Sequence, residues 1–190
     1  MSGIPGLGPR VELPDGCTLR LLEERDAEEL EHVVAANHDH LARWLPWVEA
    51  AAAAGVEARR EYVRRARRQA EANDGFQTVI VADGAIVGVV GFHHVDWVNR
   101  STSLGYWLAA GRQGRGIMTG AVRALVRHAF EAWNLNRIEI RVAVGNARSA
   151  AIPRRLGFVE EGVLRQAERH TNGYRDIVVY SLLRSDAQPS

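Results

Sequence analysis

Apolar and polar residues alternate with the period of two that a β-strand requires in several stretches of this chain. The clearest pair is 76–82 and 85–94, because Asp83-Gly84 between them is a two-residue signal for a primed turn. We therefore predict an antiparallel hairpin there. Further strands are expected at 18–22, 101–108, 137–142, 159–166 and 174–183, the last two joined around Asn172-Gly173.

Apolar residues recur at helical spacing from Asp26 to about Leu41, which predicts a helix. Asp26 with Glu29 three residues later resembles a capping box at its start. The run Trp44-Leu45-Pro46-Trp47 interrupts the pattern, because proline disfavours helical geometry in the residue before it. Both tryptophans are expected in a loop or a helix break.

Three further helices are predicted at 56–72, 117–133 and 149–156, with Gly157 as the C-cap of the last one. The first of these carries a thin apolar stripe formed by Val56, Val63, Ala66 and Ala70. One strand, two helices, three antiparallel strands, then helix, strand, helix and hairpin is a mixed order. By itself it supports an α/β or α+β domain.

Length and composition narrow the class of protein. A chain of 190 residues suffices for one domain that buries about 70% of its unfolded surface. The formal net charge is only +1, so bulk attraction to nucleic acid or to an anionic membrane is weak. Every basic side chain other than histidine is arginine.

Cysteine usage and the first residues indicate the compartment. Cys17 is the single cysteine, which excludes an internal disulfide and a multi-cysteine zinc site, and nothing marks it as a nucleophile. Residues 1–9 lack the basic start and apolar core of a secretory signal, and no apolar run has the length of a membrane span. A cytoplasmic protein without membrane association is expected.

The most informative motif lies between the strand at 101–108 and the helix that follows it. Residues 112–119 read Arg-Gln-Gly-Arg-Gly-Ile-Met-Thr, a glycine-rich turn with two arginines. The first N–H groups of a helix have no partner within it and carry partial positive charge, so they stabilise an anion. The alternative is a tight strand-to-helix connection with exposed arginines. The glycine spacing fits neither a dinucleotide fingerprint nor a P-loop.

This turn resembles the acyl-CoA pyrophosphate motif Gln-x-x-Gly-x-Gly/Ala of the GNAT acyltransferase superfamily, matched at Gln113 and Gly116, whereas Met118 departs from it. The resemblance continues from about Val11 to Leu183. Its other motifs are Gly105-Tyr106-Trp107-Leu108, Asn146-Ala147-Arg148-Ser149, Leu156-Gly157-Phe158, Glu161-Gly162 and Gln166-Ala167-Glu168. In this order the set is similar to the RimJ/RimL branch, which acetylates α-amines of ribosomal proteins and related amines.

The resemblance implies a single GNAT-type domain with a mixed, mostly antiparallel twisted sheet flanked by helices. It implies a tail at 1–10, an acyl-CoA N-acyltransferase domain at 11–184 and a tail at 185–190. Acetyl-CoA is the implied co-substrate and a primary amine the acceptor, foremost a protein or peptide N-terminus, with attack in a ternary complex. Other acceptors and donors stay open: a small amine, an antibiotic, or succinyl-CoA. Related proteins are often dimers, so a homodimer is a further expectation.

Residues for the donor follow from the same resemblance. The pantetheine arm lies beside the strand end, and the diphosphate is held by main-chain amides with help from Arg112 and Arg115. Asn146 matches an asparagine that contacts the arm, although it also suits a turn before a helix. The implied donor-binding residues are Trp107, Leu108, Ala109, Arg112, Gln113, Gly114, Arg115, Gly116, Ile117, Met118, Thr119 and Asn146.

Three side chains are candidates for proton transfer. Glu168, in Gln-Ala-Glu, occupies the acceptor side of the RimL pattern and is the candidate base; the alternative is an isolated surface glutamate. Ser149 matches the serine that would protonate the CoA sulfur, and its alternative role is an N-cap. Tyr180 is a second candidate acid, or a core residue. An α-amine of pKa about 7.7 to 8.0 is roughly a tenth neutral at pH 7, which suits a modest base better than a lysine amine does.

The remaining candidates concern the acceptor and rival functions. Trp44 and Trp47 either wall the acceptor site or pack in the core. The histidines are scattered, so no metal is expected. Six arginines between Arg59 and Arg68 would suit an RNA- or ribosome-binding module, but interleaved glutamates favour a solvated helix face, so no direct nucleic-acid binding is expected.

Overall fold

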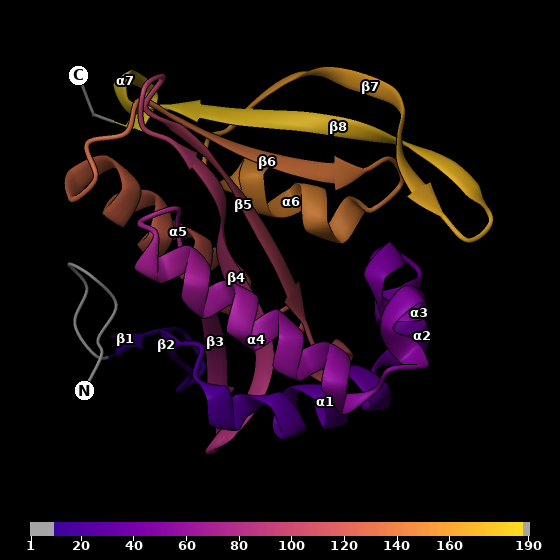
Figure 1. Ribbon diagram of the computed structural model, residues 1–190. Helices are drawn as coiled ribbons and strands as arrows, with labels where there is room; N and C mark the ends of the chain where they lie inside the picture. Colours follow the sequence, from indigo (N-terminus) through magenta and orange to yellow (C-terminus); the bar gives the residue numbers. More distant parts are fainter. Residues whose placement is uncertain (1–9, 188–190) are drawn as a thin grey trace.

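The computed structural model describes residues 10–187, which form one eight-stranded sheet with helices on both faces (Figure 1). The strand order is β1-β2-β3-β4-β5-β6-β8-β7, and every neighbouring pair is antiparallel except β5 and β6. The strands are β1 Val11–Glu12, β2 Thr18–Leu21, β3 Gln77–Ala82, β4 Ala85–Asp96, β5 Ser101–Leu108, β6 Arg137–Ala143, β7 Val159–His170 and β8 Gly173–Leu183. This mixed, mostly antiparallel sheet confirms the predicted fold class.

The longer helices of the described residues lie on the two faces of the sheet (Figure 1). They are α1 Ala27–Ala36, α2 His38–Ala42, α3 Pro46–Ala52, α4 Val56–Glu71, α5 Ile117–Glu131, α6 Ala147–Arg155 and α7 Arg184–Ala187, with short 3-10 turns η1 Glu24–Asp26 and η2 Ala110–Arg112. Helices α1 and α4 cover one face of the sheet and α5 and α6 the other, while α2 and α3 lie beside the tip of the β7–β8 hairpin.

Alternation along the strands explains the two apolar layers. Val79 on β3 belongs to the cluster under α1 and α4, whereas its neighbour Ile80 belongs to the larger cluster under α5. The β3–β4 hairpin turns at Asp83-Gly84, both with positive φ (51° and 80°), as a primed turn requires. The predicted hairpin is confirmed.

The predicted helix to Leu41 is wrong in two respects. The capping box lies one turn earlier: the Asp26 carboxylate accepts from the N–H of Glu23, and Asp26 makes no side-chain cap to the following helix. The helix also breaks at Asn37 (φ −120°). The Asn37 side chain bonds the Val33 carbonyl and accepts from the N–H of Ala110, so a contact distant in sequence sets the break.

Other boundaries differ by smaller amounts. Pro46 is the first residue of α3, so Trp47 is helical and only Trp44 lies in the break, because proline is well accommodated in a first helical turn. Helix α4 matches its prediction closely, but Ala70 is exposed and leaves the stripe. Residues 185–187, expected as a tail, belong to α7, where Asp186 accepts from the N–H of Leu183. Arg10, the last residue of the predicted N-terminal tail, directly precedes β1, and residues 1–9 and 188–190 lie outside the described residues.

The parallel strands β5 and β6 separate along their length, and this separation positions the site. They pair only from Ser101 opposite Arg137 to Leu104 opposite Ile140. Beyond that point 105–108 pairs only with β4, and 141–143 pairs only with β8. The sheet therefore opens into a wedge at the end of β5 that leads to α5.

Candidate active site

The glycine-rich turn forms the start of α5 and has the geometry of an anion site. Gly114 and Gly116 have φ of 79° and 77°, a left-handed conformation that other residues adopt at a cost, and Gly116 is the N-cap. Among the described residues, no acceptor pairs with the backbone N–H groups of 114–119, and the first helical bond runs from Gly120 to the Gly116 carbonyl. The first turn of α5 contains no acidic residue. Six consecutive N–H groups are thus free to hold phosphate oxygens.

Arginine and glutamine side chains surround this turn. Arg112 pairs with Asp83 (2.6 Å) and Arg115 with Asp15 (3.1 Å). Gln113 connects two other elements, because its Oε1 accepts from Arg148 on α6 (2.7 Å) and its Nε2 lies 2.9 Å from His40 Nε2 on α2. Arg155 donates to the Thr119 hydroxyl at 2.9 Å. Arg112 and Arg115 therefore pair with exposed carboxylates, while Arg148 and Arg155 bond neutral side chains, and all four surround the turn.

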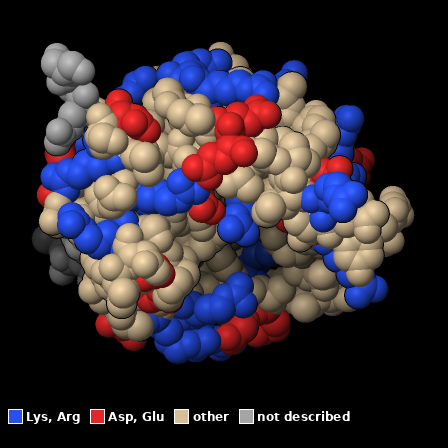
Figure 2. Space-filling view, turned by 90° about the horizontal axis from the view of Figure 1, so that it is seen from above, with Lys and Arg blue, Asp and Glu red and all other residues tan. Residues whose placement is uncertain are grey.

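A cleft of about 2480 Å³ runs from this turn through the wedge between β5 and β6. Figure 2 shows the surface hollowed near the middle of the face seen from above, with arginine side chains at its rim. Its lining includes most of the predicted donor-binding residues. The lining omits two of them, Ala109 and Arg115. The N–H of Ala109 donates to Val87 and its carbonyl accepts from Arg112, so its backbone is already bonded.

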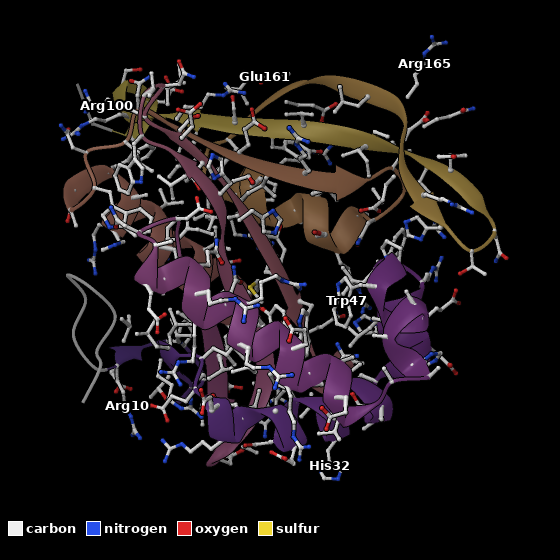
Figure 3. The ribbon with its side chains drawn as sticks, in the orientation of Figure 1. Arg10, His32, Trp47, Arg100, Glu161 and Arg165 are labelled. Carbon is white, nitrogen blue, oxygen red and sulfur yellow. The ribbon has the colours of Figure 1, made fainter. Side chains whose placement is uncertain are left out.

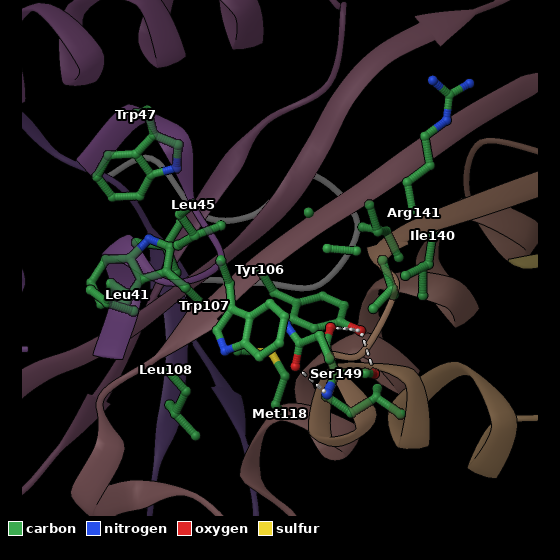
Figure 4. A pocket seen from close by; sticks show the side chains of 18 of the residues that line it. Leu41, Leu45, Trp47, Tyr106, Trp107, Leu108, Met118, Ile140, Arg141 and Ser149 are labelled. Carbon is green, nitrogen blue, oxygen red and sulfur yellow. Dashed lines mark hydrogen bonds between the residues drawn. The ribbon is translucent and has the colours of Figure 1, made fainter. Parts of the chain in front are cut away.

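Asn146 and Ser149 stand at the start of α6, facing the wedge. Asn146 is the N-cap, since its Oδ1 accepts from the N–H of Ser149 at 3.2 Å. Ser149 is not the cap, and its Oγ donates to the hydroxyl of Tyr106 at 3.3 Å. That hydroxyl donates in turn to the Ser149 carbonyl at 3.1 Å, as the dashed lines in Figure 4 show. Both predicted residues therefore line the cleft, and Tyr106 joins them.

Tyr106 is a site residue for which the sequence analysis predicted no role. It lies on β5 just beyond the last residue pair with β6, at the point where the wedge opens. Burial raises the pKa of Tyr106 to about 12, so the phenol keeps its proton at neutral pH. Its position immediately before Trp107 at the strand end was the available signal.

Glu168 lies in the cleft because β7 carries a bulge. Between the pairs Leu164–Ile177 and Glu168–Arg175, β7 contains three residues where β8 contains one. Gln166 within the bulge has φ of 51°, and its N–H donates to Asp176 at 2.8 Å. The extra residues change the direction of the strand and present Glu168 to the cleft.

His170 accompanies Glu168 on the same strand and is a second residue that the sequence analysis did not single out. Its Nε2 lies 2.7 Å from Glu168 Oε2. The His170 side chain is nearly buried, at 7% exposed, whereas that of Glu168 is 37% exposed. A fixed imidazole thus holds one carboxylate oxygen and leaves the other toward the cleft.

The two predicted tryptophans line the cleft opposite α6. Trp47 on α3 lies near the opening between α3 and the β-strands (Figure 3), with the Arg59 guanidinium 4.8 Å from its ring centroid. Arg59 is buried and bonds Glu31 at 2.9 Å. Trp44 contacts two other arginines, Arg43 and Arg175.

The remaining candidates lie elsewhere. Tyr180 is fully buried in the core and does not line the cleft, so its role as a second acid is not supported. Cys17 is fully buried, and burial raises the pKa of its thiol. Within residues 10–187, no group of three or more potential ligands is arranged to hold a metal, and no helix is long and apolar enough to cross a membrane.

Comparison with known proteins identifies relatives across most of the chain. A family profile described as an acetyltransferase (GNAT) domain matches residues 17–159. The chain is 39% identical over 169 residues to the putative ribosomal N-acetyltransferase YdaF of Bacillus subtilis strain 168, which covers 89% of this chain and 92% of that protein.

Two solved structures have the same fold and contain the expected co-substrate or its product. RimL, a ribosomal L7/L12 α-N-protein acetyltransferase in complex with coenzyme A, matches with a TM-score of 0.87 at 27% identity over 94% of this chain and 99% of that one. The microcin C7 self-immunity acetyltransferase MccE, in complex with acetyl-CoA and AMP, matches with a TM-score of 0.83 at 28% identity over 89% and 93%.

Proposed function

The chain belongs to the GNAT acetyltransferase family and is a CoA-dependent N-acetyltransferase, and we propose that it acetylates the α-amine of a protein or peptide N-terminus by direct attack in a ternary complex. One observation carries this proposal. The cleft through the wedge between β5 and β6 joins six N–H groups, which have no partner within residues 10–187, to Glu168, whose carboxylate His170 holds.

The residues present fit the diphosphate end of acetyl-CoA. Apart from the neighbouring residues in the chain, a Cβ atom added at Gly114 or Gly116 would meet no atom within 4 Å, so the turn has open space around both glycines. Trp107 and Leu108 line the cleft between this turn and the wedge and would contact the pantetheine arm. When bound, acetyl-CoA supplies the activated acetyl carbonyl.

Glu168 is the proposed acceptor of the amine proton. Its Oε2 is held by His170, so its Oε1 is the atom that would take the proton from an α-ammonium group. An α-amine of pKa about 7.7 to 8.0 is partly neutral at pH 7. Glu168 therefore need only take one proton from the α-ammonium group, or orient the neutral amine. A lysine amine has a pKa near 10.4, so its deprotonation at pH 7 would cost several kcal/mol more, at about 1.4 kcal/mol for each pKa unit.

Ser149 and Tyr106 form the proposed acid. Ser149 Oγ donates to the Tyr106 hydroxyl in the structure, and the Tyr106 hydroxyl donates to the Ser149 carbonyl. A rotation of the Ser149 hydroxyl would turn its proton toward the cleft, and Tyr106 would then donate to Ser149 Oγ. The pair can therefore deliver a proton to the departing sulfur without exposing a charge in the wedge.

The names of two relatives support the acceptor class. YdaF is described as a putative ribosomal N-acetyltransferase, and RimL as an α-N-protein acetyltransferase of ribosomal L7/L12. We extend that acceptor class, a ribosomal or other protein N-terminus, to this chain. Small amines and a larger acyl group such as succinyl are the competing possibilities that the test must separate.

The test measures the release of free thiol from acetyl-CoA or succinyl-CoA with three kinds of acceptor. These are peptides with a free α-amine, lysine peptides whose N-terminus is blocked, and small amines. The proposal predicts turnover with acetyl-CoA and α-amine peptides, with the added mass on the terminal nitrogen. Glu168→Gln should keep acetyl-CoA affinity and lower kcat about a hundredfold. Turnover confined to small amines or blocked lysine peptides would overturn the proposed acceptor.

The RNA-binding alternative is weakened by the ion pairs of α4. Five of its six clustered arginines bond glutamates, and only Arg65 packs on a tyrosine instead. Paired arginines on a solvated face have little free charge for phosphates. Acetyl-CoA should raise the melting temperature of the protein while RNA leaves it unchanged.

A further inference from the structure

Two arginines converge on Trp44 at the acceptor end of the cleft. The Arg43 guanidinium lies 5.0 Å from the centroid of the Trp44 ring, and that of Arg175 lies 5.5 Å from it. Arg43 follows α2 and Arg175 belongs to β8, so segments far apart in sequence bring them together. No carboxylate oxygen of residues 10–187 lies within 4.0 Å of either guanidinium.

Their location links them to the proposed base. Arg175 is the residue directly opposite Glu168 in the β7–β8 pairing. Arg43 lines both the main cleft and a smaller open pocket of about 410 Å³ bordered by α2, α3 and the β7–β8 turn, and Arg175 and His170 line that smaller pocket as well. Side chains directly opposite on paired strands have Cβ atoms about 5 Å apart. Both cations therefore lie close to the point where the acceptor amine would bind.

The acidic groups around this pocket are already engaged. Asp39 lies 3.2 Å from His38, Glu49 accepts from the Thr171 hydroxyl, and Glu168 bonds His170. The other titratable group on the pocket wall is Tyr174, which is exposed. Within residues 10–187, neither arginine forms an ion pair with one of these carboxylates, so both guanidinium groups keep N–H groups for a ligand.

Stacked arginines are suited to one kind of ligand. A guanidinium that stacks on an indole keeps its N–H edge free, and that edge matches a carboxylate through two parallel hydrogen bonds. An acceptor with an α-ammonium group on Glu168 and a carboxylate on Arg43 and Arg175 would satisfy both charges at once.

We propose that the preferred acceptor is an acidic N-terminus, with Asp or Glu as its first or second residue, whose side-chain carboxylate binds Arg43 and Arg175. The spacing limits the choice, because one residue of extended chain spans at most about 3.6 Å. This inference rests on the proposed function and specifies its acceptor.

The test compares kcat/KM for C-terminally amidated peptides that begin Ser-Asp, Ser-Asn, Asp-Ser and Asn-Ser and are otherwise identical. The wild-type enzyme should prefer an acidic peptide over its amide counterpart about tenfold, mainly through KM. Arg175→Gln combined with Arg43→Gln should bring that ratio near one, mainly by raising the KM for the acidic peptides. Raising the salt concentration should shrink the wild-type ratio.

Arg165→Gln is the matched control. Arg165 is an exposed arginine on β7 that lines neither the cleft nor the smaller pocket, and Figure 3 shows it pointing away from the cleft. Arg165→Gln removes one positive charge from the hairpin that carries Arg175 and should leave the ratio at the wild-type value.

The possible failures are distinguishable. If no α-amine peptide is acetylated, the proposed function itself is wrong. If the peptides are acetylated with a ratio near one in the wild-type enzyme, or if the ratio persists in the double variant, only the acidic-acceptor proposal is overturned. A free Ser-Asp dipeptide that outcompetes every amidated peptide would overturn the N-terminal acceptor in favour of a small acidic one.

Discussion

His170 Nε2 lies 2.7 Å from Glu168 Oε2, and the two residues are two positions apart on the same strand. Positions two apart on a strand project from the same face, so this contact needs no contribution from a distant element. Because His170 is 8% exposed and Glu168 is open to the cleft, the buried imidazole fixes the rotamer of the carboxylate. His170 is therefore a positioning residue for the proposed base.

Removing that contact should lower turnover without affecting the donor. We predict that His170→Leu lowers kcat about tenfold, with an unchanged KM for acetyl-CoA, because Glu168 then samples several rotamers. His170→Gln should restore most of the activity, since its amide N–H can donate to the same oxygen. Steady-state kinetics with thermal melting as a folding control would decide. Equal losses in both variants at equal stability would contradict a positioning role.

The contact between Tyr106 and Ser149 predicts a second effect on kcat. Tyr106→Phe keeps the ring in place but removes both hydrogen bonds to Ser149. Once Ser149 Oγ has given its proton to the sulfur, no phenol is then present to supply another. We expect kcat with acetyl-CoA to fall about tenfold or more, because the departing CoA thiolate is no longer protonated efficiently, while KM changes little. Ser149→Ala should show a similar loss, and the double variant no further loss, because the two groups act as one unit. Additive losses would indicate independent roles.

The sequence predicted the fold and the glycine-rich turn before α5 well because both depend on local signals. Strand alternation and the Asp83-Gly84 turn determine the β3–β4 hairpin without reference to the rest of the chain. The glycines at 114 and 116 likewise open α5 by their own conformation. The break at Asn37 was missed because its side chain accepts a hydrogen bond from the N–H of Ala110, which lies on a distant element.

The acceptor side could be predicted only in part. Glu168 was identified by resemblance, but its orientation depends on the β7 bulge, which the Gln166–Asp176 hydrogen bond stabilises across two strands. Neither the opposition of Arg175 to Glu168 nor its contact with Trp44 follows from spacing in the sequence. Such contacts arise from strand register, which periodicity alone leaves open.

The left-handed conformation of Gly116 predicts a selective defect in donor binding. Gly116→Ala meets no atom within 4 Å but must adopt φ near 77°, which costs an alanine about 1 kcal/mol. We expect the melting temperature to fall by about 2–4 °C and the KM for acetyl-CoA to rise several-fold, because the N–H groups turn away from the phosphates.

Gly111→Ala is the control for that experiment. Gly111 lies in the preceding 3-10 turn, has equally open space around it and has no positive φ. It should change neither the melting temperature nor the KM for acetyl-CoA. A Gly116→Ala enzyme with wild-type donor affinity would show that this turn does not hold the diphosphate.

His128 on α5 predicts a pH dependence of stability that is independent of catalysis. Its ring is buried among Phe76, Phe92 and Trp133, and within residues 10–187 neither ring nitrogen has a hydrogen-bond partner. Burial lowers the pKa of His128, because no neighbouring charge stabilises the imidazolium. The unfolded chain, with a histidine pKa of about 6.5, then binds the proton more readily than the folded protein does.

The direction of the effect follows from this difference. The stability that a neutral His128 contributes is complete above about pH 6.5 and is lost as the pH falls toward the lower folded-state pKa, with a slope of at most about 1.4 kcal/mol per pH unit. His128→Phe keeps an aromatic ring in the cluster and removes the titration, so its free energy of unfolding should decline less between pH 7.5 and pH 5.5. Urea unfolding at the two pH values measures this, and because only the difference between the two pH values is compared, a constant packing cost of the phenylalanine cancels. Identical declines in both proteins would mean that His128 already takes up its proton in the folded state.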